Sequence, residues 1–566
     1  MRFPSLLLSA LALAAHALAG TASPLAAQRV LGPGDDAVTI PRGMLRIGIG
    51  GELTIHRDRW RDGTLERLGA GFTFDALGPS QLAVLGPLQQ SVRDLGAPGF
   101  AASLGASRLD LRQRIFVTPF SLEVGATDWL TVGVEAPLVR VRSEARFRLD
   151  GATATLGPNP YFLGTNVPFS NRTTINAFHA AATSLESRRN ACIADPASAP
   201  ECPSIIAEAA QVNALIAGTA AFASGLASTY GGQGFPVPSA YVPMAGSPAA
   251  LALLARVDSL RTSFTRYGVT DITSTTALPL GAQAPLSAED LDQLLRDPTS
   301  GYGARPLKSS AQLGIGDIDV QVKLKLFDSF GSAAGRATAG RLRADRFGIR
   351  QSVGLTYRIG LGTPAAPGDF LDLGTGSGEN AIGVRSYTDL VINDRFWTAV
   401  ALGWAKAQGG DVVVRVPTVP GDQLLEPWRE VVATVTRGPV LQAELAPRFH
   451  LSDYIAVGGY WGWRHRAADR YDPQMSASAG RAVNPAGMAS AIASTEQRAG
   501  FSLTFSTLAA QARGNAARGN AARGKVGLGF ELSFSHQQSF ASSQGIVPKA
   551  WEDRLQLRYY TRLFGR

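Results

Sequence analysis

Long hydrophobic runs are almost absent from this sequence of 566 residues. Beyond residue 28 no stretch of about 18 apolar residues occurs, so the sequence predicts no membrane-spanning helix. Charged residues are also scarce, at 17%, while glycine is abundant, with 62 residues. This composition is unusual for a soluble exported enzyme.

The N-terminus has the pattern of a secretory signal peptide. Arg2 precedes an apolar run from Leu6 to about Ala19, and small residues follow as far as Gln28. The run is too short to span a membrane, so we predict that residues 1–28 are a signal peptide; the alternative is a buried N-terminal helix. The net charge of +9 on an exported chain suits anionic lipid head groups or acidic solutes better than nucleic acid.

Cysteine is nearly missing, and recognisable catalytic motifs are missing altogether. Cys192 and Cys202 are the only cysteines, and an even, close pair in an exported chain predicts one disulfide that closes a small loop. Two cysteines cannot build the usual four-ligand zinc site. The histidines show no metal-binding spacing, and no G-x-S-x-G motif occurs. We expect no catalytic residue, no metal site and no cofactor.

Many segments alternate between apolar and polar residues. In residues 317–326 the even positions from Ile318 to Leu326 are apolar, and the odd positions hold Asp319, Gln321, Lys323 and Lys325. A period of two indicates a β-strand with one apolar face and one polar face. A soluble sandwich and a transmembrane barrel both use such strands. The barrel is favoured because several segments reach ten residues and their polar faces mix glycine and serine with charged residues.

The alternation predicts an all-β transmembrane barrel of about twelve antiparallel strands. The expected strands are 44–56, 109–124, 130–147, 312–327, 346–361, 380–391, 396–406, 431–450, 455–464, 498–508, 526–536 and 554–564.

Three similar tetrapeptides precede strands, at residues 127–130, 393–396 and 452–455. Each has a small polar residue followed by Asp, which can close a tight turn by bonding its own backbone. When the strands alternate in direction, all three turns fall on the periplasmic side. The connections 57–108, 148–311, 362–379, 407–430, 465–497 and 537–553 then fall on the outer side, in agreement with the long outer loops of bacterial barrels.

The long connection 148–311 changes to a helical period. Apolar residues recur at spacings of three and four around 175–185, 205–216 and 253–267, and Ser287 begins a fourth helix. We therefore expect residues 29–147 to form barrel strands one to three, 148–311 a helical insert, and 312–566 strands four to twelve. The insert could fold inward as a plug or outward as a cap, and the expected disulfide would link its first two helices.

The stretch DFLDLGTGSGENAIGV, residues 369–384, looks like the first motif of S-adenosylmethionine-dependent methyltransferases. Such enzymes need a strand, a glycine loop and a helix within a parallel sheet. Here an alternating segment follows the glycines, with no helical period. We interpret the stretch as a glycine-rich outer loop that enters a strand.

Three segments together resemble a known family: SLEVGATDWLTVGVEAPLVRV (121–141), GIGDIDVQVKLKLF (314–327) and LGTGSGENAIGV (373–384). The family comprises bacterial outer-membrane β-barrel proteins regarded as transporters and linked to the meta-cleavage pathway of phenol degradation. Pro137, Gly316-Asp317 and the run Gly374–Ser377 match its motifs. The resemblance covers about two thirds of the chain. It implies passage of small, aromatic or apolar solutes, but no residue-level binding site carries over.

These patterns lead us to expect a monomeric channel or transporter for small solutes in the outer membrane of a Gram-negative-type bacterium. Its partners would be outer-membrane lipid and those solutes, with no nucleic acid. The alternative is a surface-exposed structural or adhesion barrel whose lumen is closed and whose insert binds a partner. Candidate lumen-lining residues are Arg46, Glu52, Lys323, Lys325, Arg350, Arg358, Glu444, Arg448 and Arg558. Their positive excess predicts a mild preference for anions; alternatively, they form ordinary ion pairs that fill a closed lumen.

Overall fold

The computed structural model describes residues 36–298, 302–330, 347–393, 395–416, 424–425, 427–473, 488, 492–508 and 529–563. The expected signal peptide lies outside these ranges. The chain forms two compact units. The barrel unit comprises Met1–Gly71, Asp110–Arg146 and Leu307–Arg566, and the helical unit comprises Phe72–Leu109 and Phe147–Pro306.

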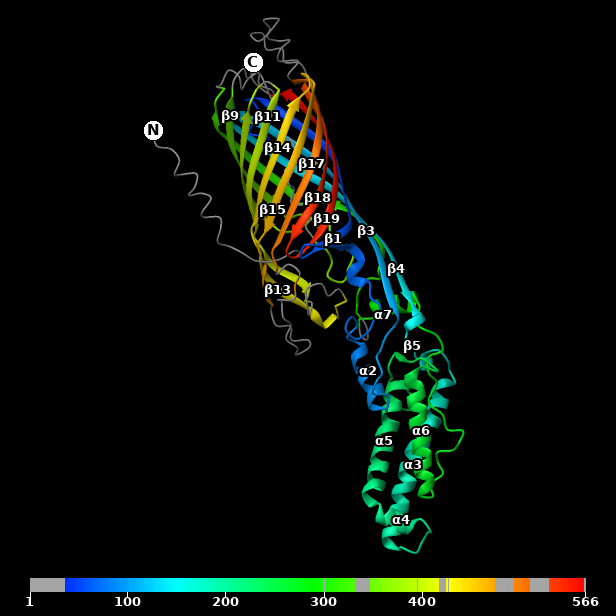
Figure 1. Cartoon of the computed structure of the whole chain (residues 1–566). Coiled ribbons are helices and arrows are strands. Elements are labelled where there is room, and N and C mark those ends of the chain that lie inside the picture. The colour runs from blue at the N-terminus through cyan, green and yellow to red at the C-terminus, as the bar shows by residue number, and fades with distance from the viewer. Residues whose placement is uncertain are drawn as a thin grey trace. The chain divides into compact units, whose positions relative to one another are not determined.

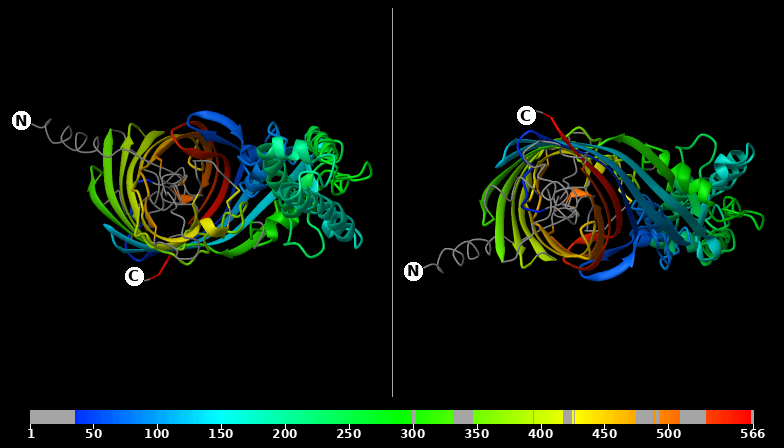
Figure 2. Two further views of the ribbon diagram at one scale, coloured as in Figure 1. Left: turned by 90° about the horizontal axis from the view of Figure 1, so that it is seen from below. Right: turned by 90° about the horizontal axis from the view of Figure 1, so that it is seen from above.

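Twelve strands form the closed antiparallel barrel, as the alternation predicted (Figure 1). Neighbouring strands are hydrogen-bonded in chain order, and the last strand pairs with the first, with Met44 opposite Arg562 and Arg61 opposite Ile546. Figure 2 shows the closed ring of strands from both ends. The barrel strands are β1 (Met44–Arg61), β3 (Ala106–Thr127), β4 (Leu130–Asp150), β8 (Ile318–Asp328), β9 (Gly348–Ile359), β10 (Ala381–Val391), β11 (Phe396–Ala407), β14 (Val440–His450), β15 (Ile455–Arg466), β17 (Ser494–Ser506), β18 (Gly529–Ser543) and β19 (Ile546–Arg562).

Shorter elements accompany the barrel strands. β2 (Thr64–Arg67) pairs with β1, and β7 (Lys308–Ile315) pairs with β4 between Leu138 and Arg146. A separate three-stranded sheet joins β12 (Gly410–Arg415), β13 (Glu430–Thr436) and β16 (Arg470–Pro473). Two of the 3-10 helices are η1 (Leu68–Phe72) and η4 (Pro427–Arg429).

The outer surface of the barrel is apolar and exposed. Leucine, isoleucine, valine and phenylalanine side chains face outward on successive strands, for example Ile49, Phe120 and Leu555, each 45–52% exposed. Exposed aromatic residues occur near both strand ends, including Trp129 at one turn and Trp404 toward the opposite end. Apolar bands between aromatic girdles are the mark of barrels whose outer face contacts lipid.

Three sequence predictions about strand limits are wrong. The expected strand 431–450 is two strands, β13 and β14, which belong to different sheets. The chain turns between them at Gly438-Pro439, where a proline cannot donate to a ladder. The expected strand 312–327 divides into β7 and β8 at Gly316-Asp317. The expected loop 537–553 is instead a continuous hairpin of β18 and β19, because Gln544 and Gly545 both adopt positive φ (64° and 65°) and close a tight turn.

The helical unit has its own hydrophobic core. Its elements are α2 (Leu85–Asp94), η2 (Gly151–Thr153), β5 (Leu156–Pro158), η3 (Pro160–Phe162), α3 (Val167–Ala194), α4 (Cys202–Ala207), α5 (Ala209–Tyr230), β6 (Tyr241–Pro243), α6 (Pro248–Arg266) and α7 (Ala288–Arg296). Phe178 of α3, Leu226 of α5 and Phe264 of α6 are fully buried in it. α5 is long and apolar enough to cross a membrane by length and composition, yet Val212, Phe222 and Leu226 bury one of its faces in this core. Ser287, expected to begin the fourth helix, is the N-cap of α7 and forms a capping box with Asp290.

The expected disulfide links the end of α3 to the start of α4. Cys192 and Cys202 lie ten positions apart, with their Cα atoms 5.0 Å from each other, and both are fully buried. Because a short loop is closed, the bond restricts the unfolded chain.

We expect the double variant Cys192→Ser/Cys202→Ser to lower the free energy of unfolding of the helical unit by about 2–3 kcal/mol. Thermal loss of helical circular dichroism measures this change. The heat-modifiable gel mobility of the barrel serves as the internal control and should not change. An unchanged helical melting curve would show that the bond contributes nothing.

Candidate transport path in the barrel lumen

The strand alternation that turns apolar residues outward turns charged residues into the barrel. All nine lumen candidates occupy inward positions, and all are buried or half-buried. Seven of them form ion pairs, and the structure supplies partners that the sequence analysis did not select. The pairs are Arg46–Glu123, Glu52–Arg554, Lys325–Asp328, Arg350–Asp328, Arg358–Asp319, Glu444–Arg385 and Arg558–Glu531.

The closest pairs are well aligned. Arg358 donates two hydrogen bonds to the Asp319 carboxylate, at 2.8 and 2.7 Å. Arg385 donates to Glu444 at 2.6 Å, and both side chains are less than 10% exposed. Bidentate and buried pairs of this kind hold side chains in fixed positions. These pairs favour the alternative interpretation, in which the lumen charges neutralise one another.

Lys323 and Arg448 lie against aromatic rings instead. The Lys323 ammonium is 4.1 Å from the centre of the Tyr387 ring and donates to the carbonyl of Asp36 at 2.7 Å. The Arg448 guanidinium lies 5.2 Å from the Trp397 ring. Cations over aromatic faces are stabilised by the ring quadrupole.

A second charged network near the outer end was not predicted. Arg498 of β17 donates to Glu496 at 2.9 Å and to Glu552 at 3.1 Å, and Gln537 and Ser539 of β18 donate to the same two carboxylates. The same period of two could have placed these residues in the lumen, since they occupy the polar faces of β17, β18 and β19.

The segment before β1 runs across the lumen near the end with the short turns. Ala37 is fully buried against Tyr387, and its N–H donates to Asp389 at 3.0 Å. The N–H of Ile40 donates to the Thr131 hydroxyl at 2.8 Å. Since Thr131 lies on β4 and Asp389 on β10, residues 36–41 connect separated parts of the wall and narrow the path.

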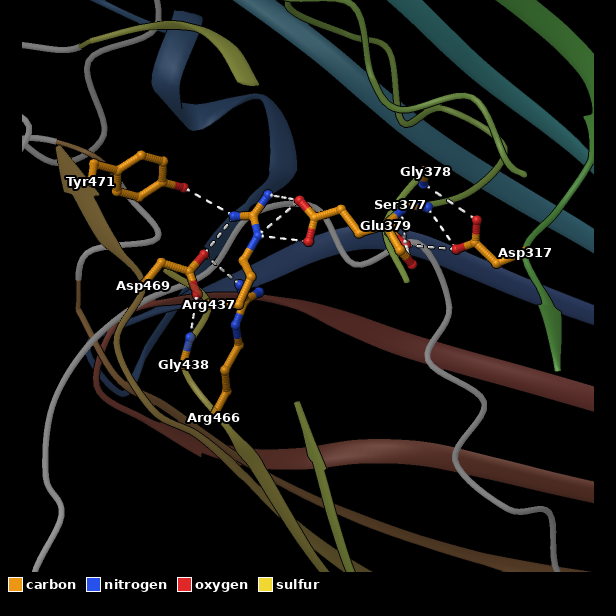
Figure 3. Close-up of polar contacts among 9 residues, drawn as sticks. All are labelled: Asp317, Ser377, Gly378, Glu379, Arg437, Gly438, Arg466, Asp469 and Tyr471. Atoms are coloured by element: carbon orange, nitrogen blue, oxygen red, sulfur yellow. Dashed lines mark hydrogen bonds and ion pairs between the residues drawn. The ribbon is translucent and has the colours of Figure 1, made fainter. Parts of the chain in front are cut away.

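The glycine-rich loop closes around one carboxylate at the other end (Figure 3). Asp317, between β7 and β8, accepts hydrogen bonds from Ser377 N at 2.8 Å, Ser377 Oγ at 2.7 Å and Gly378 N at 3.3 Å. It also accepts one from Gly362 N at 3.0 Å. Gly376 is required because a Cβ there would lie 2.8 Å from Asp317 Oδ1. We call this arrangement the Asp317 clasp.

The loop is also bound at further points, one of which is the hydrogen bond from Thr375 Oγ1 to the carbonyl of Ile315 at 3.3 Å. The carbonyl of Leu371 accepts from Ser143 at 2.7 Å, and Glu379 pairs with Arg437 (Figure 3). Arg437 also contacts Asp469 at 2.8 Å and Tyr471 at 3.3 Å. Burial disfavours the charge of Arg437, but Glu379 and Asp469 outweigh it and raise the pKa of Arg437 above its ordinary value. Arg437 therefore remains charged and anchors the loop.

The stretch 369–384 thus has no methyltransferase architecture. Residues 369–380 belong to the loop that connects β9 and β10, and 381–391 form β10, which pairs antiparallel with β9 and β11. This arrangement confirms the interpretation of a glycine-rich loop that enters a strand. Across the described residues, no group of three or more His, Cys, Asp or Glu side chains is placed to hold a metal ion.

Three cavities of about 60, 40 and 100 Å³ lie along the lumen wall. Glu135 lines all three, and Asp319 and Arg358 line two of them. The first cavity has one apolar side, formed by Ile115, Val117, Pro119, Pro137, Val139 and Leu373, and one polar side, formed by Glu52, Glu135, Asp317, Asp319, Arg358 and Thr375. The lumen therefore holds a series of small spaces that meet at Glu135, between residues 36–41 and the glycine-rich loop.

Comparison with known proteins yields no match to a family model and none to a curated protein. Among solved structures, the barrel is similar to an outer membrane channel from Pseudomonas putida F1, with 9% identity and a TM-score of 0.36 over 94% of this chain and 98% of that one. The P. putida toluene transporter TodX shows 9% identity and a TM-score of 0.23 over 93% and 92% of the two chains. A Pseudomonas aeruginosa FadL homologue shows 8% identity and a TM-score of 0.24 over 97% and 100%.

Similarities of this size assign neither a family nor a substrate. The location follows from the fold itself. A closed antiparallel barrel satisfies every strand edge within the ring, and an apolar exterior around a charged interior is stable only in lipid. The chain is an outer-membrane β-barrel protein of a Gram-negative-type bacterium.

Proposed function

We propose that this barrel passes small aromatic or otherwise apolar solutes across the outer membrane. The observation that carries the proposal is the first cavity, whose wall joins six apolar side chains to a charged side formed by Glu52, Glu135, Asp317, Asp319 and Arg358. The apolar side suits a largely apolar molecule, and the charged side can hold a polar edge of that molecule. The paired charges elsewhere in the lumen offer a dissolved ion few free partners.

The second candidate function is a structural or adhesion barrel with a closed lumen. The dense ion pairing and the small cavities favour it, since they leave little continuous space. The two functions differ in one measurable respect: the full chain of a transporter carries solute in liposomes, whereas a barrel with a closed lumen does not.

Removal of residues 36–41 tests the proposal. In liposomes, the shortened protein should admit a small uncharged aromatic solute faster than the full chain does, because Ala37 and Ile40 no longer cross the lumen. The carboxylate analogue of that solute, and a sugar of similar size, should gain less. Folding is monitored by heat-modifiable gel mobility.

A matched control replaces Thr39 by valine. Thr39 contacts the carbonyl of Asp128 at 3.1 Å, and the change leaves the segment in place. Equal, negligible flux through the full chain and the shortened barrel would favour the structural function and contradict transport.

A further inference from the structure

The outward faces of three adjacent strands change from apolar side chains to arginines at the outer end. On β1, Ile47 and Ile49 are followed by Ile55 and then Arg57. On β3, which runs in the opposite direction, Arg112 and Arg114 continue the row of Phe116, Phe120 and Leu122. On β4, Val132, Val134 and Leu138 are followed by Arg140, Arg142 and Arg146.

The strand register brings these positions together. Ile55 lies opposite Arg114 across the β1–β3 pair, and Arg57 and Arg114 are close enough to Arg112 to repel its charge. Across β4 and β7, Leu138 lies opposite Ile315, and Arg140 opposite Leu313. We call Arg57, Arg112, Arg114, Arg140, Arg142 and Arg146 the arginine patch.

The patch carries more positive charge than its surroundings balance. Glu144 pairs with Arg114 and Arg142, each at 3.3 Å, and the other acids at outward positions are Asp110 of β3 and Asp150 of β4. Within the described part of the chain, Arg57, Arg112, Arg140 and Arg146 have no ion-pair partner. The Nε atoms of Arg112 and Arg114 are buried and without a hydrogen-bond acceptor. Such unsatisfied donors and like charges indicate a site for an anion.

The surroundings indicate that this anion is attached to hydrocarbon. Leu313 and Ile315, beside Arg140 and Leu138, are 65% and 59% exposed. The patch continues the surface that contacts lipid, at the end opposite the short turns, which is the outer end in bacterial barrels. All six cations are arginines, whose planar guanidinium groups bind phosphate oxygens in pairs.

We propose that the arginine patch binds the phosphate groups of a phosphorylated acyl glycolipid in the outer leaflet, with its acyl chains against Phe116, Leu138 and Ile315. The site lies on the outside of the wall and is independent of the proposed transport path. On β11, which lies outside the arginine patch, the outward row of apolar side chains ends in a single cation, Lys406, so this residue provides a control.

The test uses the full-length protein in mixed micelles with diphosphorylated lipid A, and measures retained lipid by native mass spectrometry. The triple variant Arg112→Gln/Arg140→Gln/Arg142→Gln should bind about tenfold less tightly or worse, because each lost contact is a charge-assisted hydrogen bond. Lys406→Gln is the matched control and should bind as the wild type does. Solute flux should be the same in both variants.

A second variant tests the site without loss of arginine. Glu144→Gln removes the acid that competes for Arg114 and Arg142, so lipid A should bind more tightly than to the wild type. Two further measurements distinguish the source of the anion. Inorganic phosphate, added as a competitor, should not displace lipid A at equal concentration. Lipid A stripped of phosphate, offered as the ligand, should not be retained. Equal binding by the triple variant, retention of the dephosphorylated lipid, or displacement by inorganic phosphate would each overturn the proposal.

Discussion

Replacing Asp317 by alanine is expected to raise the flux of small solutes through the barrel several-fold. The side chain accepts four hydrogen bonds from the loop 362–378, and hydrogen bonds to a charged acceptor contribute about 1.5–3 kcal/mol each. Without them the glycine-rich loop loses its central attachment, although Ser143, Ile315 and Arg437 still bind it. Liposome swelling with an uncharged aromatic solute measures the change.

The matched control is Asp372→Ala. Asp372 accepts from Ala366 N at 3.0 Å and Gly374 N at 3.1 Å, both within the same loop, and holds no part of the barrel wall. Its loss should leave the flux near that of the wild type. Equal flux through the Asp317→Ala variant and the wild type would show that the clasp does not obstruct the path.

Replacing Glu444 by leucine is expected to destabilise the folded barrel by about 3–5 kcal/mol, since it leaves the buried Arg385 without its 2.6 Å counter-charge. The double variant Arg385→Leu/Glu444→Leu removes both charges and should recover most of that loss. Denaturant-induced unfolding in detergent, followed by tryptophan fluorescence, measures the free energy of unfolding.

An exposed pair provides the comparison. Arg470 and Asp472 lie 3.6 Å apart with side chains 79% and 62% exposed, so Arg470→Ala should change the free energy of unfolding by less than about 1 kcal/mol. A Glu444→Leu variant as stable as the wild type would mean that Arg385 finds another partner or water.

The strand count was predictable because lipid imposes one simple pattern on every strand. Residues such as Val320 and Leu555 must face hydrocarbon, and their neighbours must not, so a period of two remains visible in the sequence. The division of 431–450 was not visible, because β13 also alternates although it belongs to the separate three-stranded sheet. The turn at Gln544-Gly545 was missed because both flanking segments are rich in polar residues.

The lumen could be predicted only in part. Alternation places Asp319, Glu531 and Arg554 on inward faces, but it does not show which charges meet. Those contacts depend on the register between strands. The segment 36–41 and the glycine-rich loop narrow the lumen through contacts between residues far apart in the sequence. Ala37 contacts Asp389, 352 positions away, and Ser377 contacts Asp317, 60 positions away. No local pattern records either contact.

Pairing between β1 and β19 also constrains how the molecule can be made. The backbone groups on one edge of β1 remain unpaired until the last strand has been synthesised and exported, because their partners lie between Ile546 and Arg562. An exposed strand edge readily joins other chains, and contacts between distant parts of a sequence form slowly. We therefore expect a chain truncated before β19 to leave this edge of β1 unpaired and prone to aggregation.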